Sequence, residues 1–231
     1  MTADFGTMSG WPKIIFFDAA GTLIHLPKGV GWHYREVAGR HGCDVPEKAL
    51  KQAFYAAWQA APEQPETRKA RPDDDKGWWR TLVEGVLDAC EPHTAGLDRD
   101  AYFEELYAEF TKPGIWELYP EVEETLSALE GKVKLGILSN FDGRLRSVLA
   151  DLGVASAFQH WAISSEVGAD KPSPWIFQHA LALAGATPAE AIHVGDDPVC
   201  DWAAAEAAGL RAFKLERPQT TLAGLMAMLP S

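Results

Sequence analysis

The chain of 231 residues is 47% hydrophobic and carries 33 acidic against 21 basic side chains, which gives a formal net charge of −12. A chain of this length and apolar content can bury a large core, as one domain or as a domain with an insertion, so disorder is not indicated. The acidic balance argues against nucleic acid and anionic membrane surfaces as partners, because both require a basic protein face. If a phosphorylated ligand binds, the positive charge that it needs must be supplied locally.

The cysteines and the N-terminal residues indicate in which cell compartment the protein is expected. Cys43, Cys90 and Cys200 are odd in number and widely spaced, with no Cys-x-x-Cys pattern for zinc or redox chemistry. They are typical of reduced, packed thiols in a cytoplasmic protein. Residues 1–10 contain no basic residue and no apolar run, so they differ from a signal peptide and are expected to form a loose tail. No stretch reaches the roughly 18 consecutive apolar residues of a membrane span.

The first strong element is the apolar run Ile14–Phe17, which ends in Asp18 and is followed by a Gly-Thr turn. A short, wholly apolar run bounded by a turn predicts a strand buried on both faces, as in a parallel sheet. Ligands of open α/β sheets bind beyond the carboxyl ends of such strands, where Asp18 lies. Taken alone, an Asp in this position is more typical of a helix cap or a turn. The remaining elements distinguish the two interpretations.

The segment after this turn is rich in Gly and Pro as far as Gly31, which predicts a turn or flap, and it is then helical as far as Thr111. Apolar residues recur there at intervals of three and four, which predicts helices at 30–40, 46–61, 76–90 and 97–111. Residues 62–75 are polar and rich in Pro, so they predict a surface loop. No strand is predicted between 30 and 111.

Beyond Pro113, predicted helices alternate with short apolar strands. The helices are predicted at 119–129, 141–152, 173–184 and 198–208, and the strands at 133–138, 161–163, 192–194 and 211–215. This alternation is typical of a doubly wound α/β fold. The predicted fold class is therefore a Rossmann-like parallel sheet core with an inserted all-helical domain.

Polar side chains stand where three of these strands end. They are Asp18, the pair Ser139-Asn140 and the pair Asp196-Asp197, and Lys171 opens a helix between the last two. Because a parallel sheet places the carboxyl ends of its strands along one edge, these groups are expected to meet there.

These residues resemble the motifs of the haloacid dehalogenase superfamily. That family carries Asp-x-x-x-Thr on its first strand, Ser or Thr on its second, Lys before Pro, and Gly-Asp-Asp or Gly-Asp with a later Asp. The chain matches this order at Asp18 to Thr22, Ser139, Lys171-Pro172, and Gly195-Asp196-Asp197 with Asp201. Each motif alone is weak, but four in order on the predicted elements form a specific signal. The resemblance implies a Rossmann-like core at 1–24 and 112–231 and a helical cap at 25–111, which closes over the site and selects the substrate.

The resemblance also implies catalytic and phosphate-binding roles. Asp18 would be the nucleophile and would form an aspartyl intermediate that water then hydrolyses. Ser139, Asn140 and Lys171 would bind the phosphate oxygens, and Lys171 would also offset the negative charge of the crowded carboxylates.

A magnesium site is implied at the same sheet edge. Asp18, the backbone carbonyl of Ala20, and Asp196 would hold Mg²⁺, a hard cation that prefers oxygen ligands. Three further residues would support these ligands or bind a water on the metal: Thr22, Asp197 and Asp201. For Asp201 an alternative remains, since a carboxylate in the first turn of a helix also has a purely structural use.

The chain departs from the family pattern at Ala20. Family phosphatases carry a second Asp at this position, where it protonates the leaving group and activates water. A positioned general acid and base contributes roughly 100- to 10,000-fold to the rate. Alkyl phosphates are therefore expected to be poor substrates, whereas acyl and aryl phosphates, which have better leaving groups, would be less affected.

The predicted function is that of a Mg²⁺-dependent phosphatase that acts on a small phosphorylated metabolite, as a monomer or homodimer. His25, His33, His41 and the cap lysines are candidates for substrate contact.

Two other enzyme activities and one silent function are the alternatives. Dehalogenases of the family need no metal and usually lack the acidic fourth motif, so Asp196 and Asp197 argue against that activity. Phosphonate-cleaving members do have Ala at the position of Ala20, but they also use a cap lysine as a Schiff base, and Lys48 and Lys51 lie in that region. The third alternative is a catalytically silent member that binds a phosphorylated ligand or a protein.

Overall fold

The computed structural model describes residues 10–230, which divide into two compact units. The first unit contains residues 10–25, 65–71 and 118–230, and the second contains residues 26–64 and 72–117. Residues 65–71 therefore lie in the first unit, although they fall within the segment 25–111 that the sequence assigns to a cap. The predicted N-terminal tail lies, apart from Gly10, outside the described residues.

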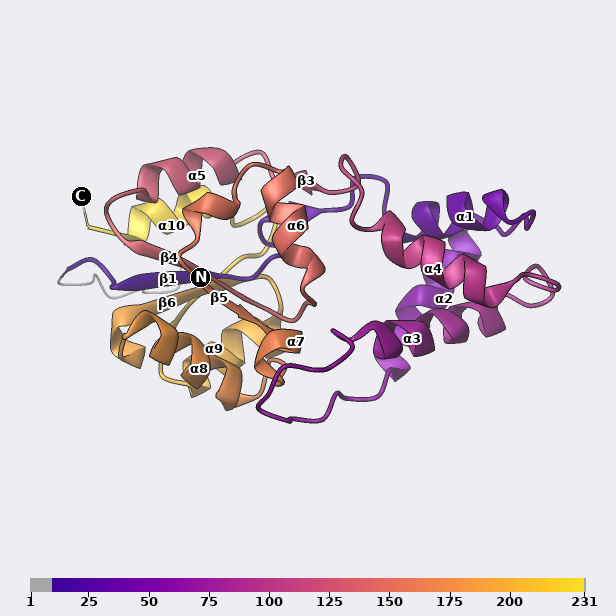
Figure 1. The fold of residues 1–231 in the computed structure, drawn as a ribbon. Coiled ribbons are helices and arrows are strands. Elements are labelled where there is room, and N and C mark those ends of the chain that lie inside the picture. The colour runs from indigo at the N-terminus through magenta and orange to yellow at the C-terminus, as the bar shows by residue number, and fades with distance from the viewer. Residues whose placement is uncertain (1–9, 231) are drawn as a thin grey trace. The chain divides into compact units, whose positions relative to one another are not determined.

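A five-stranded parallel sheet forms the centre of the first unit (Figure 1). Its strands are β1 (Ile14–Phe17), β4 (Lys134–Ser139), β5 (His160–Ile163), β6 (Ala191–Gly195) and β7 (Arg211–Lys214). They lie in the order β5-β4-β1-β6-β7, and all neighbours are parallel. The central strand is β1, and its four apolar residues are fully buried, as their composition predicted. The doubly wound α/β fold is confirmed.

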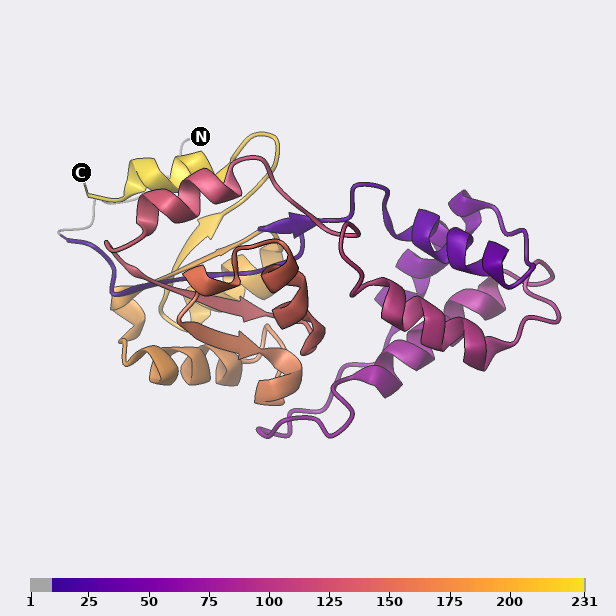
Figure 2. The same cartoon turned by 45° about the horizontal axis from the view of Figure 1, so that its top comes forward.

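Helices cover both faces of this sheet (Figures 1 and 2). One face carries α5 (Val122–Leu129), α6 (Arg144–Asp151) and α10 (Leu222–Met228), and the other carries α8 (Pro174–Ala184) and α9 (Ala204–Ala207). The short helix α7 (Ser164–Val167) follows β5. Close packing is visible at Gly136 in β4, where a Cβ would lie 2.7 Å from the ring of Phe16 in the neighbouring strand. The Phe16 ring can lie over β4 at this point because position 136 has no side chain.

Four helices form the second unit: α1 (Val30–Arg40), α2 (Glu47–Ala60), α3 (Lys76–Ala89) and α4 (Arg99–Glu109). They share a core of buried apolar residues from all four helices, including Tyr34, Leu50, Val86 and Phe103. The helices predicted from the three- and four-residue spacing are therefore confirmed, with ends that differ by at most two residues. A two-stranded sheet of β2 (Ile24–His25) and β3 (Glu117–Leu118) forms where the chain leaves and re-enters the first unit.

The predicted helices near the sheet edge differ more from the structure. The helix predicted at 119–129 begins at Val122, and the one predicted at 141–152 begins at Arg144. In the second case the Asp142 carboxylate accepts a hydrogen bond from the Arg144 amide, which fixes the start of the helix. The helix predicted at 198–208 is a π-helical turn, Pro198–Ala203, followed by α9.

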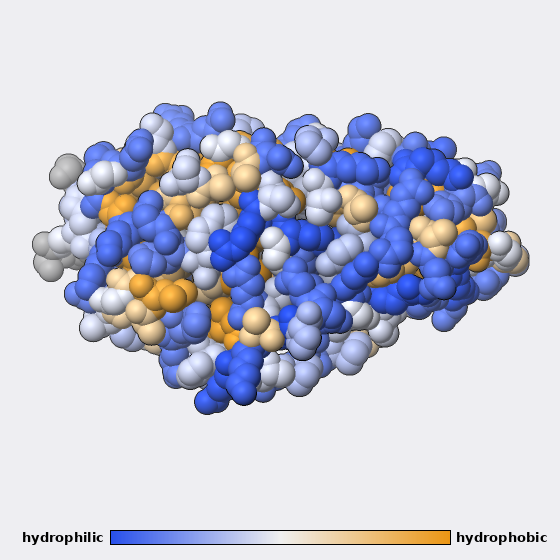
Figure 3. All heavy atoms as spheres, in the orientation of Figure 1, coloured by the Kyte–Doolittle hydropathy of each residue, from blue (hydrophilic) through white to orange (hydrophobic). Residues whose placement is uncertain are grey.

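Hydrophilic side chains predominate on the face of the molecule drawn in Figure 3, and apolar ones form small separate groups. Within residues 10–230, no helix combines the length and apolar character needed to cross a bilayer. The three cysteines are free thiols, of which Cys90 is buried and the other two are partly buried.

Candidate active site

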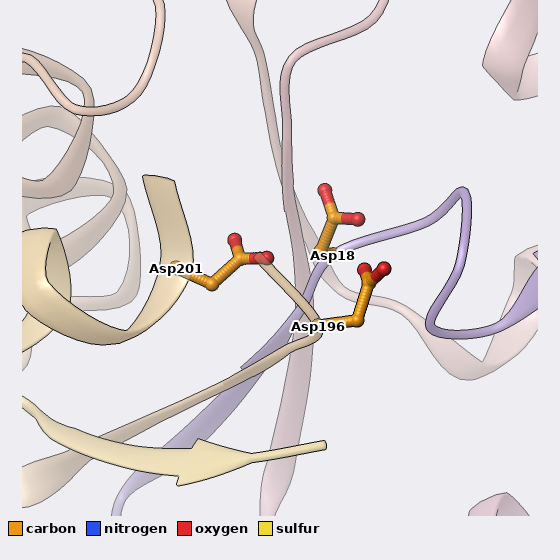
Figure 4. A group of neighbouring side chains, drawn as sticks. All are labelled: Asp18, Asp196 and Asp201. Carbon is orange, nitrogen blue, oxygen red and sulfur yellow. The ribbon is translucent and has the colours of Figure 1, made fainter. Parts of the chain in front are cut away.

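Three carboxylates meet at the carboxyl edge of the sheet (Figure 4). Asp18 follows β1, Asp196 follows the adjacent strand β6, and Asp201 reaches in from the π-helical turn. One oxygen from each carboxylate lies within 4.8 Å of the others. The parallel register pairs Phe17 with Val194, so the two strands end side by side and bring Asp18 close to Asp196.

Lys171 is the cation of this cluster. Its ammonium Nζ donates to Asp18 Oδ1 at 2.8 Å and to Asp201 Oδ1 at 2.5 Å, and the side chain is almost fully buried. Asn140 holds the Lys171 backbone on both sides of the residue: Asn140 Nδ2 donates to the Lys171 carbonyl at 2.8 Å, and the Lys171 amide donates to Asn140 Oδ1 at 2.7 Å. Of the predicted strand-end pair at 139 and 140, Asn140 thus bonds to the predicted lysine, and Ser139 bonds to Asp18.

The turn after Asp18 carries two further contacts. Thr22 Oγ1 donates to Asp196 Oδ1 at 3.2 Å. Gly21 has a φ of +86° and lies so close to the Asp196 carboxylate that a Cβ would be 2.4 Å from Oδ2. Position 21 therefore requires glycine, both for its left-handed conformation and for this close approach. Ala20 is exposed, and its backbone pairs with that of Ile24.

Asp201 is engaged by groups on three sides. Besides Lys171, its Oδ1 accepts from His193 Nε2 at 2.8 Å, and its Oδ2 accepts from the Asp197 amide at 3.0 Å. The carboxylate is buried, so it holds Lys171 in place and is more than an exposed charge in a helical turn. Asp197 is exposed, and its carboxylate accepts from the amides of Val199 and Cys200, which makes it the cap of the π-helical turn.

His193 was not among the predicted site residues. It lies in β6, is fully buried and bonds to the cluster through Asp201. One signal in the sequence could have identified it: His193 is the single polar residue in an otherwise apolar strand. A buried polar side chain is costly unless it has a hydrogen-bond partner, so its presence indicates a partner nearby.

Desolvation and the crowding of three carboxylates around one ammonium shift the pKa values in the cluster. Asp196 is an exposed residue, but partial desolvation of its carboxyl group, with Asp18 and Asp201 nearby, raises its pKa to about 6. Burial and Asp201 also raise the pKa of Asp18, against the opposing effects of Lys171 and of a hydrogen bond from Ser139. Burial would lower the pKa of Lys171, but Asp18 and Asp201 raise it above its ordinary value.

Asp201 is the exception, because its direct bonds to Lys171 and His193 outweigh burial and lower its pKa. The cluster therefore consists of one ammonium among three carboxylates, two of which are destabilised in their charged form. Hard oxygen donors with uncompensated charge fit a divalent cation such as Mg²⁺.

A segment from the loop between α2 and α3 packs beside Lys171. This segment, residues 65–71, is called the strap below. The amides of Thr67 and Arg68 donate to the Gly168 carbonyl at 2.8 and 3.0 Å, and the Arg71 amide donates to the Ser165 carbonyl at 2.7 Å. The Arg71 guanidinium pairs with Asp170, the residue before Lys171. The predicted surface loop thus has a fixed conformation on the first unit.

The predicted substrate contacts lie in different surroundings. His25 packs on Tyr119, with ring centroids 4.6 Å apart, within the first unit. In the second unit, His33 is buried and His41 bonds to Glu105 at 2.8 Å. The candidate Schiff-base residues Lys48 and Lys51 are exposed on α2.

Comparisons with known proteins agree with this geometry. A family model described as haloacid dehalogenase-like hydrolase matches residues 12–209. Haloacid dehalogenase-like hydrolase domain-containing protein 3 of Mus musculus is 34% identical over 209 residues, which cover 87% of this chain and 80% of that protein. Phosphoserine phosphatase of Thermus thermophilus is 39% identical over 104 residues, or 44% of this chain and 42% of its own. Among solved structures, the putative HAD-hydrolase YfnB of Bacillus subtilis aligns with a TM-score of 0.75 at 17% identity, over 95% of this chain and 99% of its own.

Proposed function

The chain belongs to the haloacid dehalogenase-like hydrolases, and from that premise we propose that it is a Mg²⁺-dependent phosphatase acting on a small phosphorylated metabolite. The observation that carries the proposal is the position of Asp18. It directly follows the central strand, bonds to a buried lysine and has an oxygen within 4.8 Å of an oxygen of each of two further carboxylates. The similarity to a phosphoserine phosphatase supports this reaction class. The cytoplasmic location and the monomeric or dimeric state predicted from the sequence stay predictions.

In this proposal Asp18, Asp196 and the Ala20 carbonyl hold the metal. Their oxygen atoms are the ligands that Mg²⁺ prefers. The pKa of Asp196 is raised by desolvation and by the neighbouring carboxylates of Asp18 and Asp201, whose negative charge a cation would neutralise. When bound, Mg²⁺ would supply positive charge that offsets the negative charge of the nucleophile and of the phosphoryl group. YfnB, which shares the fold, is described as bound to magnesium.

The chain's own residues then carry the transfer. An Asp18 carboxylate oxygen attacks phosphorus, the bond from phosphorus to the substrate oxygen breaks, and that oxygen leaves with the bonding electrons. Ser139 and Lys171 hold the phosphoryl oxygens during transfer. Water then attacks the phosphorus of the aspartyl phosphate and frees Asp18. Because position 20 is Ala, the leaving oxygen takes its proton from water or substrate, which favours acyl and aryl phosphates.

A substrate panel tests the proposal. An aryl phosphate, phosphonoacetaldehyde and a 2-haloacid are each incubated with the protein, with and without Mg²⁺. We expect Mg²⁺-dependent release of phosphate from the aryl ester, lost in Asp18→Asn and kept in Asp151→Asn, a matched change at an exposed position on α6. Halide release without metal would overturn the proposal, and so would cleavage of the phosphonate. Tight binding of a phosphate analogue without turnover would favour the silent binding function.

A further inference from the structure

Arg217, in the loop after β7, donates hydrogen bonds to the backbone of the turn that follows Asp18. Its Nη1 donates to the Gly21 carbonyl at 2.6 Å and its Nη2 donates to the Thr22 carbonyl at 2.9 Å. One guanidinium therefore holds two successive peptide groups of a turn that lies far away in the sequence. The planar fork of arginine can make such a paired contact, whereas the single ammonium of lysine cannot reproduce it.

The orientation of Arg217 is itself fixed from two sides. Glu121 Oε1 accepts from Arg217 Nη2 at 2.8 Å and from Nε at 3.2 Å. The guanidinium carbon lies 3.6 Å from the centroid of the Tyr119 ring, which is a close cation–π contact. The Arg217 side chain is only 19% exposed, so solvent does little to weaken these contacts.

The Gly21–Thr22 turn also sets the position of Asp196. Thr22 Oγ1 donates to Asp196 Oδ1 at 3.2 Å, and the Gly21 backbone lies against the same carboxylate. A shift of this turn by a few tenths of an ångström would therefore move Asp196 or break its hydrogen bond. Within residues 10–230, Arg217 donates no hydrogen bond to Asp18, Asp196 or Asp201. It can therefore affect the positions of these carboxylates only through the turn.

We propose that Arg217 is a positioning residue for the metal site: it fixes the Gly21–Thr22 turn and so sets the spacing between Asp18 and Asp196. The inference rests on the proposed assignment of Asp18 and Asp196 as metal ligands. Groups that orient metal ligands from outside the coordination shell typically change metal affinity by about 10- to 100-fold when they are replaced. Arg217 holds a corresponding place here, since it orients the residue that bonds to Asp196.

Metal binding to the free protein provides the test. Mn²⁺, used as a spectroscopic substitute for Mg²⁺, is titrated into the wild type, Arg217→Lys and Arg217→Ala, and the free ion is measured by electron paramagnetic resonance. We expect both variants to raise the Mn²⁺ dissociation constant about 10-fold or more. The Mg²⁺ concentration that gives half-maximal turnover should rise in parallel, with a smaller change in kcat at saturating Mg²⁺.

Arg146 offers a matched control. It makes two hydrogen bonds to the Glu166 carboxylate, at 2.8 and 2.7 Å, and its guanidinium carbon lies 4.8 Å from the Trp161 ring centroid. Its partners are therefore of the same kind as those of Arg217, except for the two backbone carbonyls of the turn. Arg146→Lys and Arg146→Ala should leave the Mn²⁺ dissociation constant within about twofold of the wild type, a limit well below the change expected for a metal-orienting group.

The outcomes separate this inference from the proposed phosphatase function. An unchanged Mn²⁺ affinity in folded Arg217→Ala overturns the inference, as does an equal loss in Arg146→Ala or a wild type that binds no metal. If the alanine variant does not fold, as judged by thermal unfolding without metal, the lysine variant decides by the same criterion. A wild type that binds Mn²⁺ but hydrolyses no phosphate ester sinks the phosphatase function, and the expected Arg217 effect on affinity would still support the inference.

Discussion

At the scale of single residues, the positive charge of Lys171 offsets the negative charge of the carboxylates in the site. Its ammonium is buried between Asp18 and Asp201, so each partner loses water and is compensated mainly by the other. Removing one member of such a group leaves an unpaired buried charge, which is why buried pairs are sensitive to truncation. His193 and the Asp197 amide also bond to Asp201. They therefore fix the carboxylate that holds the Lys171 ammonium beside Asp18.

Ala20 leads to a prediction about catalytic power. Ala20→Asp should raise kcat for an alkyl phosphate by about 100-fold or more, because it restores a proton donor for the leaving oxygen, and should raise it less for an aryl phosphate. Steady-state kinetics on both esters measure the difference. Ala20→Asn, of similar size but without an acid, is the control. A gain that is equal for the two variants, or absent in both, would show that a missing acid is not what limits this enzyme.

The sequence identified the residues that end strands, because a polar group after an apolar run is a local signal. Asp18, Ser139 and Asp196 belong to this class, and the structure brings them to one edge of the sheet. His193 and Arg217 do not, because each acts through a partner that is distant in sequence or through backbone carbonyls. Their roles depend on the tertiary arrangement, and no spacing along the chain encodes it.

At the scale of elements, the strap binds the segment 164–173 that leads to Lys171. Its hydrogen bonds reach Ser165 and Gly168, and Glu66 accepts from Ser173 Oγ. The Arg68 guanidinium lies 4.6 Å from the ring centroid of Trp175 at the start of α8. Asn140 holds the same segment through the Lys171 peptide. The lysine therefore stands on a backbone that is fixed by two independent sets of contacts.

Gly168→Ala tests the strap. Gly168 has a φ of +71°, and a Cβ there would lie 2.1 Å from the Lys69 carbonyl oxygen, so the strap must move away. Gly185, at φ +61° with no atom within 4 Å of its Cβ position, is a matched control. Gly185→Ala should cost about 1–2 kcal/mol in the free energy of unfolding, from left-handed backbone strain alone.

Gly168→Ala should cost more than this, and proteolytic cleavage between residues 62 and 75 should become faster. Urea denaturation and limited proteolysis measure both effects. Equal costs at the two glycines, with unchanged cleavage, would mean that the strap contributes nothing to stability.

Elements with an apolar run or a helical period were predictable, and elements with neither were not. The four helices of the second unit and the five strands of the sheet each have a clear apolar pattern. Helix α7 and strand β3 contain four and two residues, too few for a period to be visible, and β3 depends on pairing with β2 far away in the sequence. The strap was predicted only as a polar loop, because its fixed conformation comes from carbonyls of another segment.

Stability against acid is a property of the whole molecule, and Glu109 contributes to it. This carboxylate is buried in the second unit and bonds to Arg40 at 2.9 Å and to Lys112 at 2.7 Å. Burial alone would raise its pKa, but Lys112 and Arg40 hold the pKa of Glu109 below its ordinary value. The folded chain therefore binds this proton less readily than the unfolded chain does.

The free energy of unfolding should consequently decrease as the pH falls below about 4.5 and through the folded pKa of Glu109, while its contribution stays complete at higher pH. Glu109→Gln should lower stability at pH 7 and flatten this part of the pH dependence. Glu104→Gln, which removes an exposed pair with Lys76, should change stability by less than about 1 kcal/mol. Denaturation curves between pH 3 and pH 7 measure both; equal slopes in Glu109→Gln and the wild type would contradict the assignment.

The strap also bears on how this architecture can be recombined. The second unit consists of two chain segments, 26–64 and 72–117, and the residues between them belong to the first. A chimera that exchanges residues 26–117 for the helical region of a relative would therefore remove Arg71, and with it the partner of Asp170 beside the lysine. Two separate grafts, joined to a retained 65–71, would keep the backbone of the site intact. We therefore expect this hydrolase to accept a new helical region as two inserts and not as one.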